Sequence, residues 1–242
     1  FSALEQSEDP VTVTGRLRLL RRQGGSTFAQ IEDATGQIQL FFNKKLVGEE
    51  KYATLKLVDV ADFISVTGKL FLTKTEERTI KVDSFEMLSK AILPLPDKFH
   101  GLKDEEARYR NRYVDLIVNK DVNDLFVKRA KFVQSLRTFL TDQGYLEVET
   151  PVLENIPGGA EAEPFITHHN ALDLDLYLRI SLELHLKRLV VGGYEKVFEI
   201  GKVFRNEGVS TQHLQEFTMM ECYWAYADND KLMKFVQNMY QT

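Results

Sequence analysis

The hydrophobic periodicity of this chain changes once, near residue 92, and that change constrains the fold more than any other feature. Before it, apolar and polar residues alternate in short runs divided by turn residues, a pattern typical of β-strands. Beyond it, apolar residues recur every three or four positions, a spacing typical of helices. Pro94 and Pro96 lie between the two patterns and resist both a helix and a central strand. We therefore predict two domains, residues 1–92 and 104–242, joined by a linker at 93–103.

The first domain is predicted to contain five strands, with a helix between the third and the fourth. Turn signals such as Gln23-Gly24-Gly25 and Asp33-Ala34-Thr35-Gly36 separate the runs. This order is typical of a small Greek-key barrel of the OB type. The strand runs cover residues 11–22, 27–32, 37–42, 63–73 and 78–88, and a weaker helical pattern covers 46–58.

The second domain mixes helices and strands. Apolar residues between Leu125 and Leu140 follow helical spacing, and Gly144 is a plausible stop for that helix. The pattern further predicts an antiparallel sheet, so the fold class is α+β with an all-β N-terminal domain. Trp224 and Tyr226 continue the face of Cys222 and are expected in the core. The predicted elements are an extended segment at 145–149, a helix at 183–191 and strands at 196–204 and 216–226.

Composition narrows the class of protein. The chain has 31 basic and 36 acidic residues, and this balance excludes a histone-like polycation but not a local nucleic-acid surface. The single cysteine, Cys222, cannot form an internal disulfide, so we expect a cytoplasmic protein. No apolar run reaches the roughly 20 residues of a membrane helix, and we expect no membrane partner. Because the first residue is Phe1, we expect a fragment of a longer protein.

The first strand suggests a nucleic-acid-binding face. Arg16 and Arg18 alternate with Leu17 and Leu19, so the arginines are expected on one face and the leucines in the core. Positive charge follows phosphates, an aromatic ring stacks on an unpaired base, and an amide reads a base edge. The alternative is a solvated arginine face with the aromatic ring in the core. Further candidates for this face are Arg21, Arg22, Phe28 and Gln39.

A hairpin near the end of the chain gathers charged groups. If residues 203–208 lie on a strand, Arg205 and Glu207 point to one face. The return strand directs Phe217, Met219, Glu221 and Tyr223 to a common face, and His213 lies in the connecting loop. Such a face is costly to bury unless a charged ligand completes it. The alternative is a surface ladder of cross-strand ion pairs.

Several segments resemble one known family. Residues 144–151, Gly-Tyr-Leu-Glu-Val-Glu-Thr-Pro, resemble motif 1 of the class II aminoacyl-tRNA synthetases, their dimer-interface element. Phe204-Arg205-Asn206-Glu207, with Glu216-Phe217, resembles motif 2, their ATP-binding hairpin. An N-terminal OB domain is similar to that of the lysine, aspartate and asparagine enzymes (class IIb). Further segments resemble the lysyl-tRNA synthetases, namely residues 94–102, 157–160, 165–170, 179–184 and 186–193.

The resemblance implies ATP-dependent activation of lysine and its transfer to tRNA(Lys). Arg205 would be the catalytic residue, holding the lysine carboxylate and the α-phosphate of ATP. The other ATP contacts implied are Glu207 to the adenine amino group, Phe217 to the ring and His213 to the γ-phosphate. The resemblance also implies a homodimer formed through motif 1. Motif 3, with the acidic magnesium ligands of the family, has no counterpart before Thr242, so we expect an N-terminal fragment with weak or no activity alone.

The resemblance also implies lysine and anticodon contacts. Glu221 and Tyr223 match the positions that meet the ε-ammonium, Glu183 matches the residue that holds the α-amino group, and the Gly159 backbone lies nearby. In the barrel, Phe28 and Gln39 match positions that hold the middle uridine of the anticodon. We also assign Arg22 to the anticodon, and which of the arginines contact it stays open.

Three alternatives stay open. Leu214 and Gln215 stand where lysine enzymes carry asparagine and proline, and the His-Leu pair is closer to an asparaginyl enzyme. A non-catalytic RNA-binding module using only the barrel is another possibility, and a protein-lysylating paralogue is disfavoured because such relatives lack the barrel. His168-His169 is not expected to bind a metal, because adjacent strand residues point to opposite faces.

Overall fold

A computed structural model describes residues 9–96, 102 and 104–241 of the chain. It contains two compact units, Phe1–Asn123 and Asp124–Thr242, and each is described by itself. Residues 97–101 and 103 of the predicted linker, and residues 1–8 of the predicted first domain, lie outside the described residues.

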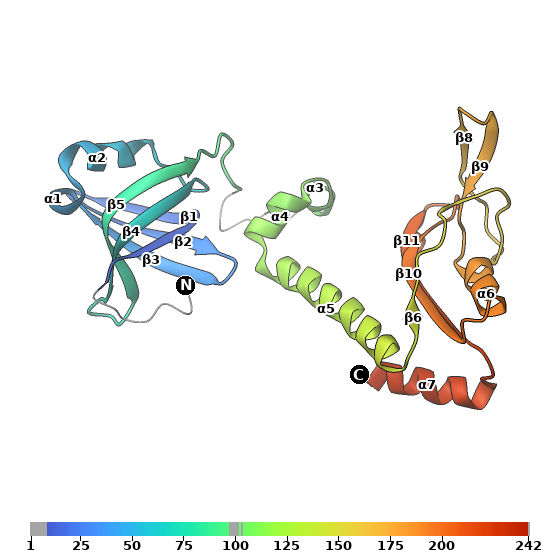
Figure 1. Cartoon of the computed structure of the whole chain (residues 1–242). Coiled ribbons are helices and arrows are strands. Elements are labelled where there is room, and N and C mark those ends of the chain that lie inside the picture. The colour runs from blue at the N-terminus through green and yellow to red at the C-terminus, as the bar shows by residue number, and fades with distance from the viewer. Residues whose placement is uncertain (1–8, 97–101, 103, 242) are drawn as a thin grey trace. The chain divides into compact units, whose positions relative to one another are not determined.

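The first unit contains a closed five-stranded barrel with strand order β1-β2-β3-β5-β4 (Figure 1). A short helical segment joins β3 to β4, as the sequence predicts, and the OB-type barrel is confirmed. The strands are β1 (Val11–Gln23), β2 (Ser26–Asp33), β3 (Gly36–Asn43), β4 (Phe63–Leu72) and β5 (Arg78–Ser89). The helical segment consists of α1 (Lys44–Val47), α2 (Glu49–Thr54) and the 3-10 turn η1 (Leu55–Leu57).

Alternate strand residues fill the barrel, and a β-bulge in β1 changes which ones do so. Leu17 pairs with Ile31 and is fully buried, but the register shifts between Leu17 and Leu19. A bulge inserts one unpaired residue and so reverses the in–out alternation beyond it. Leu20, opposite the buried Ala29, therefore packs on the core, and the prediction that Leu19 enters the core is wrong.

Two short helices complete the first unit, α3 (Glu105–Arg110) and α4 (Arg112–Val118). Asp104 caps α3, since its carboxylate accepts a hydrogen bond from the Ala107 amide at 2.7 Å. Asp115 is fully buried on α4, and its carboxylate binds Arg108 at 3.0 Å and Asn119 at 2.6 Å. This carboxylate therefore joins the two helices.

Within its described residues, the second unit contains two three-stranded sheets and three helices (Figure 1). In one sheet, with order β11-β10-β6, β10 pairs antiparallel with β11 and parallel with β6. The other sheet has the order β7-β9-β8. Among the described residues, no helix has the length and apolar character to cross a membrane. The elements are α5 (Lys120–Asp142, which begins before the unit boundary), β6 (Leu146–Glu147), β7 (Leu153–Glu154), β8 (Ile166–His169), β9 (Leu174–Leu178), α6 (Glu183–Val191), β10 (Lys196–Phe204), β11 (Glu216–Trp224) and α7 (Asn229–Gln241).

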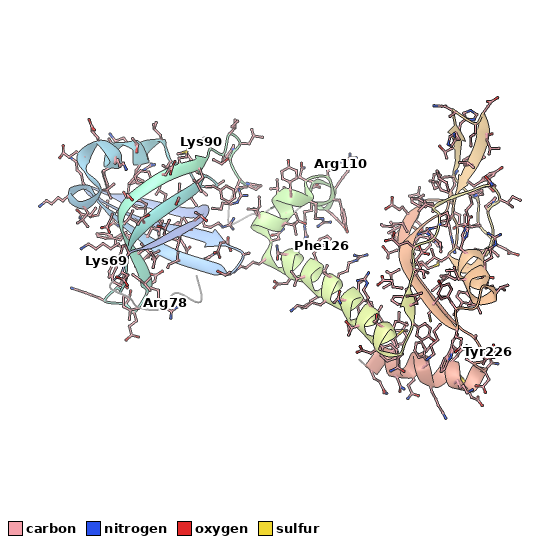
Figure 2. The ribbon with its side chains drawn as sticks, in the orientation of Figure 1. Lys69, Arg78, Lys90, Arg110, Phe126 and Tyr226 are labelled. Atoms are coloured by element: carbon pink, nitrogen blue, oxygen red, sulfur yellow. The ribbon has the colours of Figure 1, made fainter. Side chains whose placement is uncertain are left out.

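The β10–β11 hairpin separates two packing layers. On one face, Phe198 packs with Leu140, Tyr145 and Phe235, against the half-buried Trp224. A second cluster lies on the other face, built from Leu182, Leu186, Val197 and Val203, with Phe217 and Tyr223 packed against it. The prediction that Tyr226 is core is wrong, because β11 ends at Trp224 and Tyr226 follows it at φ 60° with 87% of its surface exposed (Figure 2).

Candidate active site and nucleic-acid-binding face

A carboxylate on β11 is held by three hydrogen-bond donors. Glu221 Oε1 accepts from the Ser181 hydroxyl at 2.9 Å and from the Leu182 amide at 3.1 Å. Its Oε2 accepts from the Tyr223 hydroxyl at 3.1 Å. Burial raises the pKa of Tyr223, and the negative charge of Glu221 raises it further, so the phenol stays protonated and keeps donating. Glu221 and Tyr223 are thus a fixed anion and a fixed donor on one face of the strand.

Gly159 and Glu183 lie against the same serine. Gly159 has φ 83°, and a Cβ added there would lie 2.9 Å from Glu183 Cβ and 3.0 Å from Ser181 Oγ. The Glu183 amide donates to Ser181 Oγ at 3.1 Å, and its carboxylate pairs with Lys187 Nζ at 2.7 Å. Only glycine allows such a close approach of the backbone. The structure therefore brings together all the residues predicted to bind lysine.

Arg205 lies directly after β10 and points to the same side of the hairpin. Its amide donates to the Gln215 carbonyl at 2.9 Å, which extends the hairpin by one pair. Its guanidinium carbon lies 5.3 Å from the centre of the Phe217 ring, and Nε donates to the Ile180 carbonyl at 3.3 Å. Because Ile180 precedes Ser181, this contact places Arg205 beside the residues that hold Glu221.

Glu207 and His213 are not brought to this cluster. Strand β10 ends at Phe204, so the alternation predicted for Arg205 and Glu207 does not continue, and the Asn206 amide instead donates to the Glu163 carbonyl at 2.7 Å. Glu207 is exposed. His213 is also exposed, and its Nδ1 lies 2.7 Å from Ser210 Oγ. The ATP contacts of Glu207 and His213 stay predictions.

The ladder of surface ion pairs that was the alternative for this hairpin is not what the described residues form. Within them, the ion pair that joins β10 to β11 is Lys202 with Glu216 at 2.8 Å. These two side chains lie on the face opposite Glu221, because Lys202 pairs with Thr218 and Glu221 with Glu199 in the strand register. The Lys202–Glu216 ion pair therefore does not occupy the face that carries Glu221.

Sequence reasoning missed a buried ion pair beside the cluster. Arg179 and Glu199 are 3% and 4% exposed, and Arg179 Nη1 donates to Glu199 Oε1 at 2.7 Å. Nη1 also donates to the hydroxyl and carbonyl oxygens of Thr150, and that hydroxyl donates to Glu199 Oε2 at 2.6 Å. A Cβ added to Gly201 would lie 2.4 Å from Arg179 Nη2. Glycine inside a strand was a signal available in the sequence, because it often marks a close approach. The resemblance of residues 179–184 includes Arg179 but gave it no role.

The barrel presents an aromatic pair on its outer face. The Phe28 and Phe41 rings lie 5.0 Å apart and are tilted by 44°. Gln39 is two residues from Phe41 on β3, so both point to one face, and its Nε2 donates to Thr79 Oγ1 at 2.8 Å. Phe28 is half-buried here and is not part of the barrel core. Phe28 and Gln39 therefore share the outer face, as predicted.

A row of cations continues from this aromatic pair. In the strand register, Arg21 lies opposite Phe28, Phe41 opposite Lys81, and Lys81 opposite Lys69. Residues directly opposite each other in a sheet lie on one face. Lys69 is labelled in Figure 2, where it projects from β4. We call Arg21, Phe28, Phe41, Lys81 and Lys69 the outer row. Arg21 and Phe28 are candidates from the sequence, but the other three residues are not.

Arg22, assigned to the anticodon from the sequence, lies elsewhere. It pairs with the buried Thr27, so it points to the barrel end and not to the outer row. Its Nη2 donates to the carbonyls of Leu55 and Val58 at 2.8 and 2.9 Å. The structure therefore does not bring Arg22 together with Phe28 and Gln39.

The histidine pair of β8 shows no metal-binding geometry of its own. His168 Nδ1 lies 2.8 Å from an oxygen of Asp175, and Nε2 lies 3.4 Å from an oxygen of Asp173. Among the described residues, no group of three or more histidine, cysteine, aspartate or glutamate side chains could hold a metal ion. We therefore assign a magnesium ligand to none of these residues.

Comparison with known families matches both units. The family described as tRNA synthetases class II (D, K and N) matches residues 104–242, and that described as OB-fold nucleic acid binding domain matches residues 11–88. Among curated proteins, the chain is 56% identical over 236 residues to a lysine–tRNA ligase of Bacillus subtilis (strain 168), covering 98% of this chain and 47% of that protein.

Two further relatives agree with this match. Lysine–tRNA ligases of Oceanobacillus iheyensis and Halalkalibacterium halodurans are each 55% identical to the chain. The matches cover 98% and 97% of this chain, and 48% and 47% of the two relatives. The chain thus spans about half the length of these curated proteins. Because the synthetase family matches more than half of its residues, the chain belongs to the class II tRNA synthetases of the aspartate, lysine and asparagine group.

Proposed function

We propose that the protein containing this chain is a lysine–tRNA ligase, which activates lysine with ATP and transfers it to tRNA(Lys). The observation that carries this proposal is the Glu221 carboxylate, fixed by Ser181, Leu182 and Tyr223 beside Glu183. Lysine brings two ammonium groups, and each must exchange water for an anion and hydrogen-bond acceptors. The names of the relatives, at 53 to 56% identity, support the same substrate.

The two carboxylates divide the substrate between them. Glu221 and Tyr223 receive the ε-ammonium, and Glu183 receives the α-ammonium after exchanging its partner Lys187 for the substrate. The Gly159 backbone, in close contact with Glu183 Cβ, borders the α-carbon end. A shorter or neutral side chain leaves the Glu221 carboxylate without its counter-charge, which disfavours asparagine.

Arg205 serves the chemical step. A lysine carboxylate oxygen attacks the α-phosphorus of ATP, a P–O bond forms, and the bond to the leaving pyrophosphate breaks. The guanidinium holds the carboxylate and the α-phosphate together, and its charge stabilises the negative charge that builds on that phosphate. In the second step the terminal tRNA hydroxyl attacks the lysyl carbonyl, and AMP leaves.

ATP fits the residues at the hairpin. Phe217 offers an aromatic face, and Arg205 lies 5.3 Å from the centre of its ring. An adenine on Phe217 would therefore have its phosphates within reach of a cation. Glu207 and His213 are proposed to close on the adenine amino group and the γ-phosphate. Magnesium, which the family uses with ATP, neutralises phosphate charge when bound, and we propose that its ligands are not among the described residues.

The barrel is proposed to bind the anticodon of tRNA(Lys). Phe28 stacks on the middle uridine and Gln39 reads its edge, because an aromatic ring and an amide are the groups that read unpaired bases. Arg21 and Lys81, on either side of the aromatic pair, follow the phosphates. Arg22 keeps its place as a candidate from the resemblance, although its guanidinium is engaged by Leu55 and Val58.

Residues 144–151 are proposed to form the interface of a homodimer, and we propose a cytoplasmic location. Strand β6 lies at the edge of its sheet, and Leu146, on this strand, is 47% exposed. An edge strand leaves backbone groups that a second copy can cover. In the full-length protein, Leu146→Glu is expected to convert a dimer to monomer in sedimentation velocity, and an unchanged dimer would refute the interface.

The proposed substrate is tested by lysine-dependent ATP–pyrophosphate exchange in the full-length protein. Glu221→Gln removes the counter-charge but keeps the shape, so kcat/KM for lysine is expected to fall roughly 100-fold. Glu216→Gln makes the same change on the opposite face of the same strand and is expected to leave exchange near wild type. Exchange driven by asparagine instead of lysine, or a Glu221→Gln protein as active as Glu216→Gln, would refute the proposal.

A further inference from the structure

The buried arginine described above is anchored to β10 by both its side chain and its backbone. Arg179 Nε donates to the Lys202 carbonyl at 2.8 Å, and the Phe204 amide donates to the Arg179 carbonyl at 2.9 Å. With its bonds to Thr150 and Glu199, the guanidinium binds two separate segments, β10 at Glu199 and Lys202 and the chain at Thr150. A flat group with a fixed fork of donors loses little freedom when it makes such contacts. Arg179 therefore fixes the start of the next segment against the hairpin.

The three residues that follow Arg179 make the contacts of the proposed site. The Ile180 carbonyl accepts from Arg205 Nε, and Ser181 Oγ and the Leu182 amide both donate to Glu221. These residues belong to no strand, and α6 begins only at Glu183. A displacement of this short segment would therefore move the contacts of Arg205 and Glu221 together.

Charge gives Arg179 a second effect on the same site. Glu199 lies directly opposite Glu221 in the register of β10 and β11, so the two carboxylates share one face. Like charges directly opposite each other on a sheet repel. The ion pair of Glu199 with Arg179 at 2.7 Å neutralises one of them and leaves Glu221 as the free anion for a cationic ligand. Arg179 thus also decides which of two neighbouring carboxylates carries a net charge.

We infer that Arg179, paired with Glu199, is a positioning residue for lysine recognition, acting through residues 180–182 on Glu221 and Arg205 without touching the substrate; this inference rests on the proposed function. Stability alone does not account for the pair, because a buried ion pair is often no more stabilising than apolar residues of the same volume. What the pair adds is a set of directed hydrogen bonds that an apolar replacement cannot supply.

Two variants of the full-length protein separate the effect of Arg179's directed hydrogen bonds from the effect of its charge. Arg179→Lys keeps the charge, but one ammonium cannot reach both the Lys202 carbonyl and Glu199. Glu199→Gln keeps an acceptor for Arg179, but leaves the cation unneutralised beside Glu221, where it competes with the substrate ammonium. Lys202→Met is the matched control, because it removes a cation of the same strand whose side chain faces the other way.

The measurements are the KM values for lysine and ATP, kcat for exchange, the active fraction by site titration and the melting temperature. Both variants are expected to raise KM for lysine roughly 10- to 100-fold, and Arg179→Lys also to lower kcat about tenfold. A merely structural role would lower the active fraction and melting temperature with KM for lysine unchanged, and that result overturns the inference.

The outcome is separable from that of the proposed function. Wild-type protein without lysine-dependent exchange refutes the proposed function, whereas working wild-type protein with wild-type KM in both variants refutes only the inference. A ligand-free crystal structure of Arg179→Lys adds a readout that needs no activity. The contact between Ser181 Oγ and Glu221 is expected to be broken there, and its retention at hydrogen-bond distance would overturn the role of Arg179.

Discussion

Two neighbouring arginines of β1 have different surroundings although the sequence alone does not distinguish them. Arg21 lies opposite Phe28 on the outer row, whereas Arg22 points to the barrel end and donates to the carbonyls of Leu55 and Val58. Strand alternation separates adjacent residues to opposite faces, but the bulge at Leu17/Leu19 decides which residue takes which face. Both residues are exposed, but the guanidinium of Arg22 is engaged by backbone carbonyls of the barrel, whereas Arg21 lies beside the aromatic pair.

This difference predicts opposite phenotypes. Arg22→Ala removes two hydrogen bonds from a charged donor and is expected to destabilise the barrel by about 1 kcal/mol in urea unfolding. Arg21→Ala is expected to leave stability within about 0.5 kcal/mol and to weaken tRNA(Lys) binding measured by filter retention. If Arg22→Ala weakened tRNA binding at unchanged stability, the assignment made from the sequence would stand and the geometric argument would fail.

At the residue scale, the resemblance singled out the residues proposed to bind lysine, and the structure explains why they lie close together. Gly159, Glu183 and Glu221 all lie against Ser181, and Tyr223 binds Glu221. Ser181 is part of the segment 179–184 that carries the resemblance, but no role was predicted for it. Ser181 could not be found from spacing, because its partners lie on a loop, a helix and a strand far apart in the sequence. The roles of Glu207 and His213 stay predictions, since both are exposed on the hairpin loop.

At the element scale, close strand contacts fix where glycine is required. A Cβ added to Gly68 on β4 would lie 2.1 Å from the Lys81 carbonyl oxygen, at a register shift between Thr67 and Gly68. Gly68→Ala is therefore expected to destabilise the barrel by about 2 kcal/mol in thermal or urea unfolding. Gly25→Ala is the control, because its nearest atom would be 3.9 Å away. Equal stabilities of the two variants would contradict the close approach.

The outer row makes a second prediction at this scale. Lys81 lies beside Phe41, so it is expected to contact a phosphate of the bound loop. The binding constant for tRNA(Lys) falls as salt rises, and Lys81→Ala should make the slope of log K against log salt shallower by about 0.7, the value for one single-strand phosphate. Lys51, on α2 and outside the outer row, is the control. An unchanged slope in Lys81→Ala would remove this residue from the interface.

Strand periodicity predicted the elements well and their ends less well. The barrel strands, the helix Glu183–Val191 and the strand Lys196–Phe204 agree with the sequence patterns. The hairpin strand ends at Trp224, two residues earlier than predicted, because alternation by itself contains no stop signal. The bulge in β1 was equally invisible, since an extra unpaired residue leaves no mark on composition.

At the scale of the whole molecule, one carboxylate ties the end of the barrel to the chain that leaves it. Asp62 is fully buried before β4 and accepts from the Ala91 amide at 2.7 Å and from Lys90 at 2.9 Å, just beyond β5. The Asp59 amide, 2.8 Å away, is a third donor. Burial acts to raise the pKa of Asp62, but these hydrogen bonds outweigh it and hold the pKa below its ordinary value.

This lowered pKa predicts acid sensitivity. A carboxylate with a folded pKa below its unfolded value stabilises the fold above about pH 4, and that contribution is lost as the pH falls through the folded pKa. Asp62→Asn is therefore expected to lower stability at pH 7 and to reduce the loss of stability on acidification, both measured by urea unfolding between pH 7 and pH 2. A variant with the wild-type pH dependence would contradict the assignment.

The sequence pattern also predicted two domains at this scale, and family matches fall on residues 11–88 and 104–242. The placement of the boundary at 93–103 stays a prediction. The composition of the linker cannot by itself define where the second domain begins. Helices α3 and α4 follow the linker, and they are held together by the ion pairs of Asp115, which the linker sequence does not reveal.

Gly201 has a consequence for how substitutions are distributed along β10. Because the guanidinium of Arg179 crosses this position, hydrogen is the only side chain that the strand can accept there. Its neighbour Lys202 points outward to Glu216 and is half-exposed. Replacement should therefore be tolerated least at Gly201, in the middle of an otherwise ordinary strand. A substitution there is expected to disturb the proposed recognition of lysine more than substitutions of many larger residues.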